Sequence, residues 1–411
     1  MDRRTIRARY AFCACNGNVA LQCQFALLFM LLASLAFPQN VVEQAPVDKV
    51  FVSKITTLMD DAGQRRNVPL SICSLAWHPD GKSLAIDLKG VNGYYAVAQL
   101  VPFSEGSSRI RTLTDRRVRD DTRFNNGNPR WMPAGEGIVF SGQCVELPEI
   151  RRTYPGNGFA CNLFYGDREG REFWRLTDIH GGRNTARGCT MPVISQDGKA
   201  LFWTDCRQAK GERLQWGRRS IKKASLAIEN GVPNLGRVRD ITPSELKDEY
   251  LETTDCKAGM LLYSAGSYRK GWYVMDVYVQ DVSKDGVEQP RNLTNDSESM
   301  DRFPVFSPNA RRIAWASTRG NDVSYIGVDE ALWSKELRSE LWIMDIASGR
   351  RQQLTFFNQK GHEHCASAKG AYVCMAAWHP KYDNVIAIVL NCREANYETS
   401  KILLLELGVR K

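Results

Sequence analysis

Apolar and polar positions follow a repeating pattern along most of the chain: a short apolar run, a turn rich in proline, aspartate and glycine, and a second apolar run. The clearest copy, RFPVFSPNARRIAWASTRG, begins at Arg302. Two apolar runs joined by such a turn predict a β-hairpin. Further copies begin at Ser71, Gly127, Cys189 and Cys374, and a degenerate copy begins at Cys256.

A third strand and a short arm follow the hairpins. The segments LWIMDIASG from Leu341 and YVMDVYVQD from Tyr273 are two of the predicted third strands. Each arm ends in a Leu-Thr or Ile-Thr pair, and successive threonines lie 52 to 65 residues apart, at Thr114, Thr177, Thr242, Thr294 and Thr355. Four strands in a unit of about 60 residues are typical of a propeller blade.

The two ends of the propeller region supply the sixth unit. KILLLELGV from Lys401 follows the last hairpin as a third strand, and no fourth strand comes after it. VFVSKITTL from Val50 has the pattern of a fourth strand without a hairpin before it. Pairing of these strands would complete a blade and remove exposed sheet edges. The sequence therefore predicts an all-β fold: a six-bladed β-propeller of four-stranded blades, closed by pairing of the N- and C-terminal strands.

The Trp-x-Pro-Asp-Gly and Phe-Ser-Pro-Asn hairpins, the LWIMDIASG strand and the Arg-x-Leu-Thr arm together resemble the TolB-type, WD40-like propeller repeat over residues 50–411. The TolB family carries an α/β domain before its propeller, and we expect none here because few residues precede Val50. Similar blades occur in peptidases of the prolyl oligopeptidase type. The Gly-x-Ser-x-Gly motif of their hydrolase domain does not occur in this sequence. The resemblance therefore implies the fold and leaves the function open.

The first residues predict export. Four arginines within the first nine residues precede the apolar run FALLFMLLASLAF at 25–37, and Ser34-Leu35-Ala36 offers small residues to a signal peptidase. We therefore expect a signal peptide at 1–36, a linker at 37–49 and the propeller at 50–411. The mature protein is expected to be periplasmic or secreted, without a membrane span. The alternative is an uncleaved anchor at 19–37, which two internal glutamines disfavour.

The composition suits a large folded domain. Of the 411 residues, 43% are hydrophobic and 25% are charged, which provides a sizeable core and does not predict disorder. The formal net charge is +9, and the first 35 residues contribute four arginines and one aspartate to it. The remaining positive charge is only weakly clustered, so we expect no nucleic-acid partner.

Cysteine usage agrees with export. Nine of the twelve cysteines follow the predicted leader, and no Cys-x-x-Cys pair occurs. This pattern favours disulfides over structural zinc. Two pairs are centred on hairpin turns and should face each other across the strands, and a third joins the end of one strand to the start of the next. The predicted pairs are Cys189–Cys206, Cys374–Cys392 and Cys144–Cys161. Cys73, Cys256 and Cys365 have no evident partner, and reduced, buried thiols are the alternative for all.

The histidines offer one candidate metal site. His362 and His364 in the segment Gly-His-Glu-His-Cys would project to one side of an extended loop. Oligogalacturonate lyases resemble this arrangement because they use propeller histidines around a metal. They need ligands from several blades, and the sequence shows no others. We therefore expect structural or surface histidines and no cofactor. His78 and His379 occupy matching Trp-His-Pro turns and are expected to be structural.

Polar residues that interrupt the repeat are candidate binding residues. Asn126 and Asp301 begin first strands at matching positions, where a hydrogen bond to the backbone is the alternative role. The basic insertion at 207–223 contains Arg218 and Arg219, and the insertion at 328–341 has a helical pattern that contains Trp333. Insertions in a propeller lie on one face, where partners dock.

The sequence therefore predicts an exported, non-enzymatic propeller that binds a protein or a cell-envelope component. The alternative is a propeller enzyme, a lyase or hydrolase acting on an anionic polysaccharide, with a metal near His362 and His364.

Overall fold

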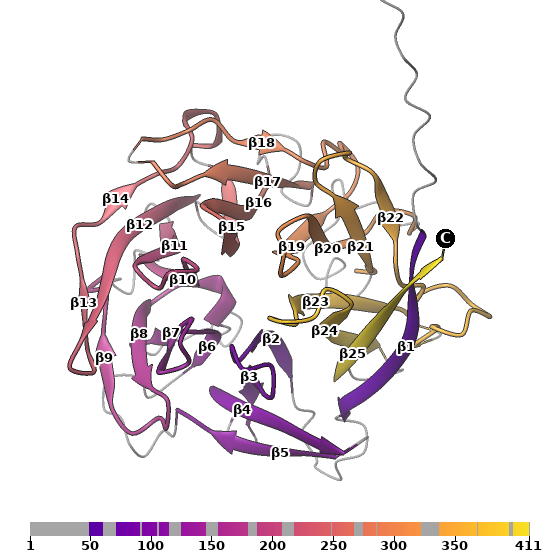
Figure 1. The fold of residues 1–411 in the computed structure, drawn as a ribbon, viewed down its shortest axis with the longest axis horizontal. Helices are drawn as coiled ribbons and strands as arrows, with labels where there is room; N and C mark the ends of the chain where they lie inside the picture. The colour runs from indigo at the N-terminus through magenta and orange to yellow at the C-terminus, as the bar shows by residue number, and fades with distance from the viewer. Residues whose placement is uncertain are drawn as a thin grey trace, which may run out of the picture. The chain divides into compact units, whose positions relative to one another are not determined.

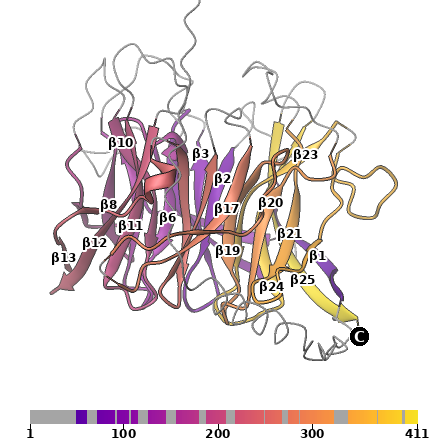
Figure 2. The same cartoon turned by 90° about the horizontal axis from the view of Figure 1, so that it is seen from above.

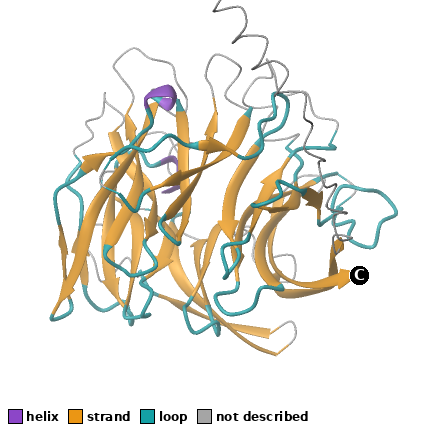
Figure 3. Ribbon diagram, turned by 45° about the horizontal axis from the view of Figure 1, so that its top comes forward, coloured by secondary structure: helices purple, strands orange, loops and turns teal. Residues whose placement is uncertain are grey.

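Six β-sheets stand around one axis as the blades of a propeller, with the first strand of each blade nearest the axis (Figure 1). The computed structural model describes residues 49–60, 71–90, 93–104, 107–114, 125–144, 155–179, 187–207, 218–247, 249–266, 274–284, 286–321, 337–367, 369–393 and 398–410. Strands dominate these residues, as Figure 3 shows. The predicted all-β, six-bladed fold is confirmed.

The first three blades follow one another along the chain, each built from neighbouring antiparallel strands. Blade 1 contains β2 (Ile72–Trp77), β3 (Leu84–Lys89), β4 (Tyr95–Ser104) and β5 (Ser107–Thr112). Blade 2 contains β6 (Asn126–Trp131), β7 (Gly137–Gln143), β8 (Cys161–Asp167) and β9 (Phe173–Arg175). Blade 3 contains β10 (Arg187–Ile194), β11 (Ala200–Arg207), β12 (Arg218–Glu229), β14 (Arg239–Asp240) and an additional strand, β13 (Val232–Leu235).

The next two blades repeat this order, and the sixth combines both ends of the propeller. Blade 4 contains β15 (Tyr250–Lys257), β16 (Met260–Gly266), β17 (Met275–Asp281) and β18 (Arg291–Asn292). Blade 5 contains β19 (Asp301–Phe306), β20 (Arg312–Ser317), β21 (Glu340–Asp345) and β22 (Arg351–Gln353). Blade 6 contains β23 (Ala371–Trp378), β24 (Val385–Arg393), β25 (Glu398–Arg410) and β1 (Lys49–Asp60). Two short 3-10 turns are η4 (Pro155–Asn157) and η5 (Ser244–Leu246).

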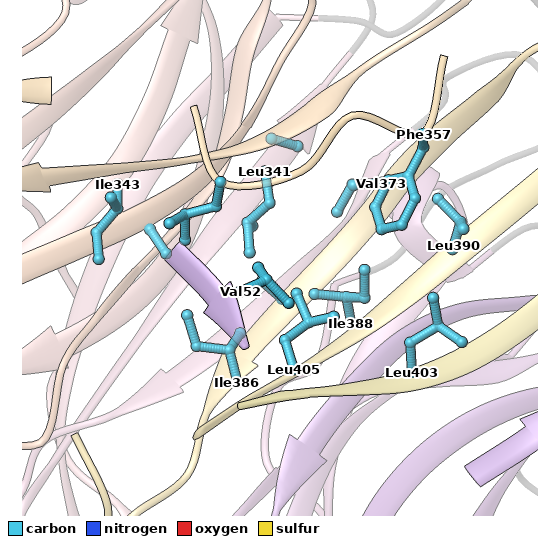
Figure 4. Packing of buried hydrophobic residues seen from close by; sticks show 14 of the residues in the cluster. Val52, Leu341, Ile343, Phe357, Val373, Ile386, Ile388, Leu390, Leu403 and Leu405 are labelled. Atoms are coloured by element: carbon cyan, nitrogen blue, oxygen red, sulfur yellow. The ribbon is translucent and has the colours of Figure 1, made fainter. Parts of the chain in front are cut away.

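The ring is closed by β1, which pairs with β25 at the rim of blade 6. Val52 of β1 lies among Ile386 and Leu405 of blade 6 and Leu341 of blade 5 in one buried cluster (Figure 4). Farther along the strand, Leu58 belongs to a cluster that includes residues of blade 1. The N-terminal strand therefore packs against three consecutive blades, and the predicted closure is confirmed.

The repeated threonines have a common structural role. Each threonine hydroxyl accepts a hydrogen bond from a backbone N–H of the third strand in its own blade, at 2.8 to 3.0 Å. All five threonines are buried. A buried N–H at the edge of a sheet needs a partner, and the threonine supplies one where the short fourth strand ends. The five donors, in order, are Val97, Leu163, Ile221, Val277 and Leu341.

The two Trp-His-Pro turns join blades to their neighbours. His78 packs edge-on against Trp131 of blade 2, with ring centroids 4.7 Å apart. His379 packs against Trp77 of blade 1 at 4.8 Å, and its Nε2 lies 3.2 Å from the carbonyl oxygen of Gly81. A Cβ at Gly81 would lie 2.5 Å from the His379 ring, and φ there is +77°. Both histidines therefore have packing roles between blades.

The cysteine pairs predicted from hairpin symmetry are not bonded in the structure. Cys189 lies opposite Asp205, whereas Cys206 lies opposite Gly188. Neighbouring residues on a strand point to opposite faces of the sheet, so these two thiols point apart. A β-bulge between Thr190 and Val193 shifts the register by one residue, and counting from the turn missed it.

The other two predicted pairs are not bonded either. Cys374 lies within a bulge of β23, and Cys392 is opposite Ala371. Cys161 is opposite Gln143, one position from Cys144. Each predicted pair contains at least one free thiol in the structure. These are Cys189 and Cys206 in the first pair, Cys374 in the second and Cys161 in the third.

The topology gives the ring two different faces. Successive antiparallel strands bring every first strand to begin at one end of the ring and every first-to-second-strand turn to the other (Figure 2). We call the first end the strand-start face. It carries the starts of β2, β6, β10, β15, β19 and β23. We call the other end the hairpin face, and it carries the turns at 78–83, 132–136, 195–199, 258–259, 307–311 and 379–384.

Candidate functional site

The first strands turn side chains toward the axis at β-bulges. All six pairings of a first strand with its second strand show an irregular register. In three blades a residue at the bulge has a left-handed backbone, with φ of 52° at Asn128, 53° at Met191 and 55° at Phe303. A bulge adds one residue to one strand and redirects its side chains. The bulges therefore determine which residues meet near the axis.

Three apolar side chains meet there. Met191 of β10, Phe303 of β19 and Met375 of β23 form one buried cluster. They come from the third, fifth and sixth blades, so their contact crosses the ring. Methionine is flexible and fills irregular spaces well. The cluster packs apolar atoms at the axis at the level of the bulges.

Arg130 links four blades beside this cluster. Its guanidinium donates hydrogen bonds to the carbonyl oxygens of Leu75 at 3.4 Å, Pro129 at 3.0 Å and Thr254 at 3.2 Å. One of its nitrogens also lies 4.0 Å from the sulfur of Met375. Five N–H donors in a rigid fork allow one arginine to satisfy carbonyls in several directions. Sequence reasoning missed Arg130, although a cation within the first strand of a blade, Asn-Gly-Asn-Pro-Arg-Trp, was a signal.

A buried carboxylate near the strand-start face binds two arginines. Glu252 of β15 accepts hydrogen bonds from Arg302 of β19, with Nε–Oε2 and Nη2–Oε1 distances of 2.9 and 2.6 Å. Nη1 of Arg219, from β12, lies 3.6 Å from Oε1 of Glu252. The Tyr250 hydroxyl donates to the same Oε1 at 2.5 Å. The four side chains connect blades 3, 4 and 5.

The charges in this cluster decide its ionisation. Burial by itself raises the pKa of Glu252, but the charges and hydrogen bonds of Arg302 and Arg219 outweigh it and lower the pKa below its usual value. Burial raises the pKa of Tyr250 far above its usual value, so it acts as a neutral donor. Two guanidinium groups around one carboxylate leave the cluster with one excess positive charge. A bidentate arginine–carboxylate pair holds its geometry well.

This arrangement corrects one predicted binding residue. The side chain of Arg219 is 0% exposed and stacks on the Tyr250 ring at 4.1 Å, so it cannot serve as an exposed interface anchor. Arg218 is half-buried at the start of β12, on the strand-start face. Trp333 and most of the predicted helical insertion lie outside the described residues. The described end of that insertion, 337–339, is not helical.

Asn126 and Asp301 occupy the starts of first strands, as the sequence predicts, but both are buried within their blades. The Trp315 indole donates to Oδ1 of Asp301 at 3.0 Å, and Nη2 of Arg319 lies 3.9 Å from its Oδ2. Burial raises the pKa of Asp301 to about 6. Asp301 therefore has a partner inside the fold where the sequence suggested a ligand contact or a backbone hydrogen bond.

The two clustered histidines pack into an aromatic group. The His362 ring stacks on Phe356 with centroids 4.5 Å apart, and the His362 and His364 rings lie 4.6 Å apart edge-to-face. Nδ1 of His362 accepts a hydrogen bond from the backbone N–H of His364 at 3.0 Å. Burial and the neighbouring His362 lower the pKa of His364, so its imidazole is neutral at pH 7.

The donor set around these histidines is incomplete for a metal. Within the described part of the chain, no group of three or more His, Cys, Asp or Glu side chains is placed to hold a metal ion. His180, the remaining histidine, lies outside the described residues. A catalytic zinc site requires about three protein ligands.

Comparisons with known proteins agree with the fold. No model of a protein family and no curated protein sequence matches the chain. The structure is similar to TolB from Acinetobacter baumannii, with a TM-score of 0.40 and 14% identity over 83% of this chain and 65% of that one. It is also similar to an oligogalacturonate lyase from Vibrio parahaemolyticus, with a TM-score of 0.44 and 10% identity over 87% of this chain and 98% of that one.

A third similar structure is prolyl oligopeptidase B from Galerina marginata, with a TM-score of 0.44 and 11% identity over 84% of this chain and 43% of that one. At these scores and identities, the likeness concerns the fold alone. The chain covers 65% of the length of the first TolB structure.

Proposed function

We propose that the protein is an exported, non-enzymatic propeller that binds a protein or cell-envelope partner through its strand-start face. The observation that carries the proposal is that the reactive groups described above are engaged by partners inside the fold. Glu252 is held by Arg302 and Tyr250, and His362 is stacked on Phe356. Groups held in this way by internal partners are suited to fixing blades relative to one another, since catalysis needs a group that reaches a substrate.

The strand-start face is the better candidate surface for a partner. The two insertions identified in the sequence leave β11 and β20 at this end of the ring, and Arg218 begins β12 there. Long connections on a rigid scaffold commonly carry binding residues. The hairpin face is built from short turns, and two of them are occupied by the inter-blade contacts of His78 and His379.

Export rests on the sequence of residues 1–36, which lie outside the described residues. Among the residues that the structure describes, no helix has the length and apolar character needed to cross a bilayer. Export predicts that the protein isolated from its native cells begins near residue 37. N-terminal sequencing of that protein tests the assignment, and a chain beginning at Met1 in the cytosol contradicts it.

Partner capture with matched surface variants tests the binding proposal. Purified protein is immobilised and exposed to solubilised envelope from the native cells. Arg218→Glu and Trp333→Ala should each reduce capture of a specific partner about tenfold or more, because arginine and tryptophan anchors dominate interfaces. Lys381→Glu, an exposed change on the hairpin face, is the control and should leave capture unchanged. Equal capture by all three variants contradicts the assignment of the face.

The second candidate function is a propeller enzyme acting on an anionic polysaccharide. One observation favours it: Nδ1 of His364 is buried, and no hydrogen-bond partner for it is found within the described residues. A metal near His362 and His364 would need further ligands. Metal analysis of the purified protein separates the two candidates: one bound metal per chain, lost in His362→Ala/His364→Ala together with turnover of an anionic polysaccharide, favours the enzyme.

A further inference from the structure

Two cysteines that the sequence did not pair with each other lie side by side between the first and sixth blades. Cys73 is in β2 and Cys374 is in β23, and each lies four residues before the tryptophan of a Trp-His-Pro turn. The strands β2 and β23 are the innermost strands of their blades (Figure 1). Cys374 also packs against the buried cluster that contains Ile72 and Leu75 of β2.

The two thiols lie in one neighbourhood. Cys374 packs on the cluster that holds Ile72 and Leu75, the residues on either side of the Cys73 bulge. The sulfur of Cys73 also lies 3.7 Å from the Tyr95 hydroxyl and 3.8 Å from the Ser71 hydroxyl. Both cysteines are half-buried free thiols. A disulfide between them brings the two sulfurs to about 2.05 Å.

The bulges explain why this pair forms where hairpin symmetry predicts another. Cys374 is the extra residue between Val373 and Met375 in the pairing of β23 with β24. Cys73 lies within the matching bulge of β2, between Ile72 and Leu75. Bulged residues are released from the regular alternation of the sheet, and these two meet across the boundary between blades instead of across a hairpin.

We propose that Cys73 and Cys374 form a redox site whose oxidation joins blade 1 to blade 6 covalently. The oxidant is a small or protein disulfide. The Cys73 thiolate attacks one sulfur of the donor, forms a mixed disulfide and expels one donor thiolate. The Cys374 thiol then loses its proton and attacks the Cys73 sulfur, which expels the second donor thiolate. The protein dithiol is oxidised by two electrons, and the donor disulfide is reduced to two thiols.

The rate of the second attack depends on the surroundings of Cys374. The adjoining Cys73 sulfur and burial raise the pKa of Cys374 well above its usual value, so its thiolate is scarce at neutral pH. The thiolate is the nucleophile in exchange, so attack by Cys374 is slow at neutral pH. Oxidation should therefore become faster as the pH rises.

The bond would change how the ring is closed. The chain from Cys73 to Cys374 runs from the first blade through to the sixth, so a disulfide between them makes one covalent ring through all the blades. In the reduced protein the strand pairing that closes the ring is the non-covalent pairing of β1 with β25. Oxidation should therefore protect the propeller against opening when β1 detaches.

Peptide mapping tests the bond directly. The full-length protein is incubated with excess oxidised glutathione at pH 8, alkylated and digested with trypsin without reduction. The three relevant cysteines fall in separate peptides, 67–82, 370–381 and 382–393. We expect 67–82 linked to 370–381. A link between 370–381 and 382–393, or alkylation of both Cys73 and Cys374 in the oxidised sample, overturns the proposal.

Stability measurements test the consequence. The oxidised protein should melt about 5 °C or more above the reduced protein, because the closed loop is very long. Cys73→Ser and Cys374→Ser should each abolish this difference, and Cys256→Ser, which alters a buried thiol elsewhere, should retain it. If the serine variants fail to fold, Leu58→Ala in β1 replaces them: its melting temperature should rise more on oxidation than that of the wild type. Equal melting temperatures of the oxidised and reduced wild type overturn the proposal that the Cys73–Cys374 bond stabilises the closed ring.

Discussion

Weakening β1 should open the propeller, and the structure sets the size of the effect. Four side chains of β1 are buried, namely Val50, Val52, Leu58 and Met59. Burial of such a side chain stabilises by about 1.5–3 kcal/mol, so the strand contributes about 6–12 kcal/mol as an upper estimate. A domain typically has about 5–15 kcal/mol in total. Deleting 50–58 removes three of these four side chains, worth about 4.5–9 kcal/mol on the same scale, and should leave no stable closed monomer.

Single substitutions measure the same contribution in steps. Leu58→Ala should lower the free energy of unfolding by about 2–4 kcal/mol, because Leu58 packs with blade 1 residues in a core cluster. Lys54→Ala is the matched control in the same strand. The Lys54 side chain is 55% exposed, and its ion pair with Glu406 is 3.7 Å long, so the change should cost less than about 0.5 kcal/mol.

Urea unfolding followed by tryptophan fluorescence gives both values, and size-exclusion chromatography reports the oligomeric state. The expected order is wild type and Lys54→Ala together, then Leu58→Ala, with the deletion aggregated or oligomeric. A deletion variant that remains monomeric with an unchanged unfolding curve refutes closure by β1. So does a Leu58→Ala variant that is indistinguishable from Lys54→Ala.

Three further predictions concern charge and aromatic packing. The pKa of Asp301 is raised to about 6, so its contribution to folding stability is complete below the usual aspartate pKa and is lost as the pH rises through 6. Asp301→Asn, which keeps an acceptor for Trp315, should therefore raise the free energy of unfolding by up to about 3 kcal/mol at pH 8 but not at pH 3.5. Equal effects at both pH values in urea unfolding would refute this. The pKa of Glu252 is lowered, so its contribution to folding stability is present above the usual glutamate pKa and is lost on acidification. Glu252→Gln should lower the free energy of unfolding by about 3–5 kcal/mol at pH 7, because two buried arginines lose their counter-charge. This loss of stability should shrink below pH 4.5, and a loss that stays constant with pH would contradict the ion-pair assignment. His362→Ala/His364→Ala should cost about 1–2 kcal/mol through lost ring contacts and leave elemental metal content unchanged, whereas loss of a stoichiometric metal would contradict a packing role.

The repeat pattern predicted the fold because its signals are local. A Pro/Asp/Gly turn between apolar runs defines a hairpin within about 20 residues, and the hydroxyl of Thr355 caps the backbone of Leu341 in the same blade. The closure by β1 also followed from counting strands, since a blade without a fourth strand and an unpaired strand at the other end complete each other.

The site was less predictable because its contacts join distant blades. Glu252 and Arg302 are 50 residues apart, and Arg130 reaches Met375 across 245 residues. Nothing in the local pattern distinguishes a buried arginine such as Arg219 from an exposed one in a basic insertion. The misassignment of Arg219 and the omission of Arg130 both reflect side-chain partners supplied by the ring as a whole.

Register was the second source of error. A bulge moves every later residue of a strand by one position and reverses the face it occupies. Neither bulge contains a glycine that would mark it, at Thr190–Val193 or at Val373–Met375, so symmetric counting from the turns was the natural choice. The same bulges bring Cys374 to Cys73.

Site-specific photo-crosslinking in the native cells tests the central claim, that the strand-start face binds a partner, most directly. A photoreactive phenylalanine analogue is placed at position 218 on the strand-start face or, as the control, at position 381 on the hairpin face. The account predicts a discrete adduct with one protein or envelope component from position 218 and none from position 381. Adducts from position 381 alone, or from neither position, would contradict it.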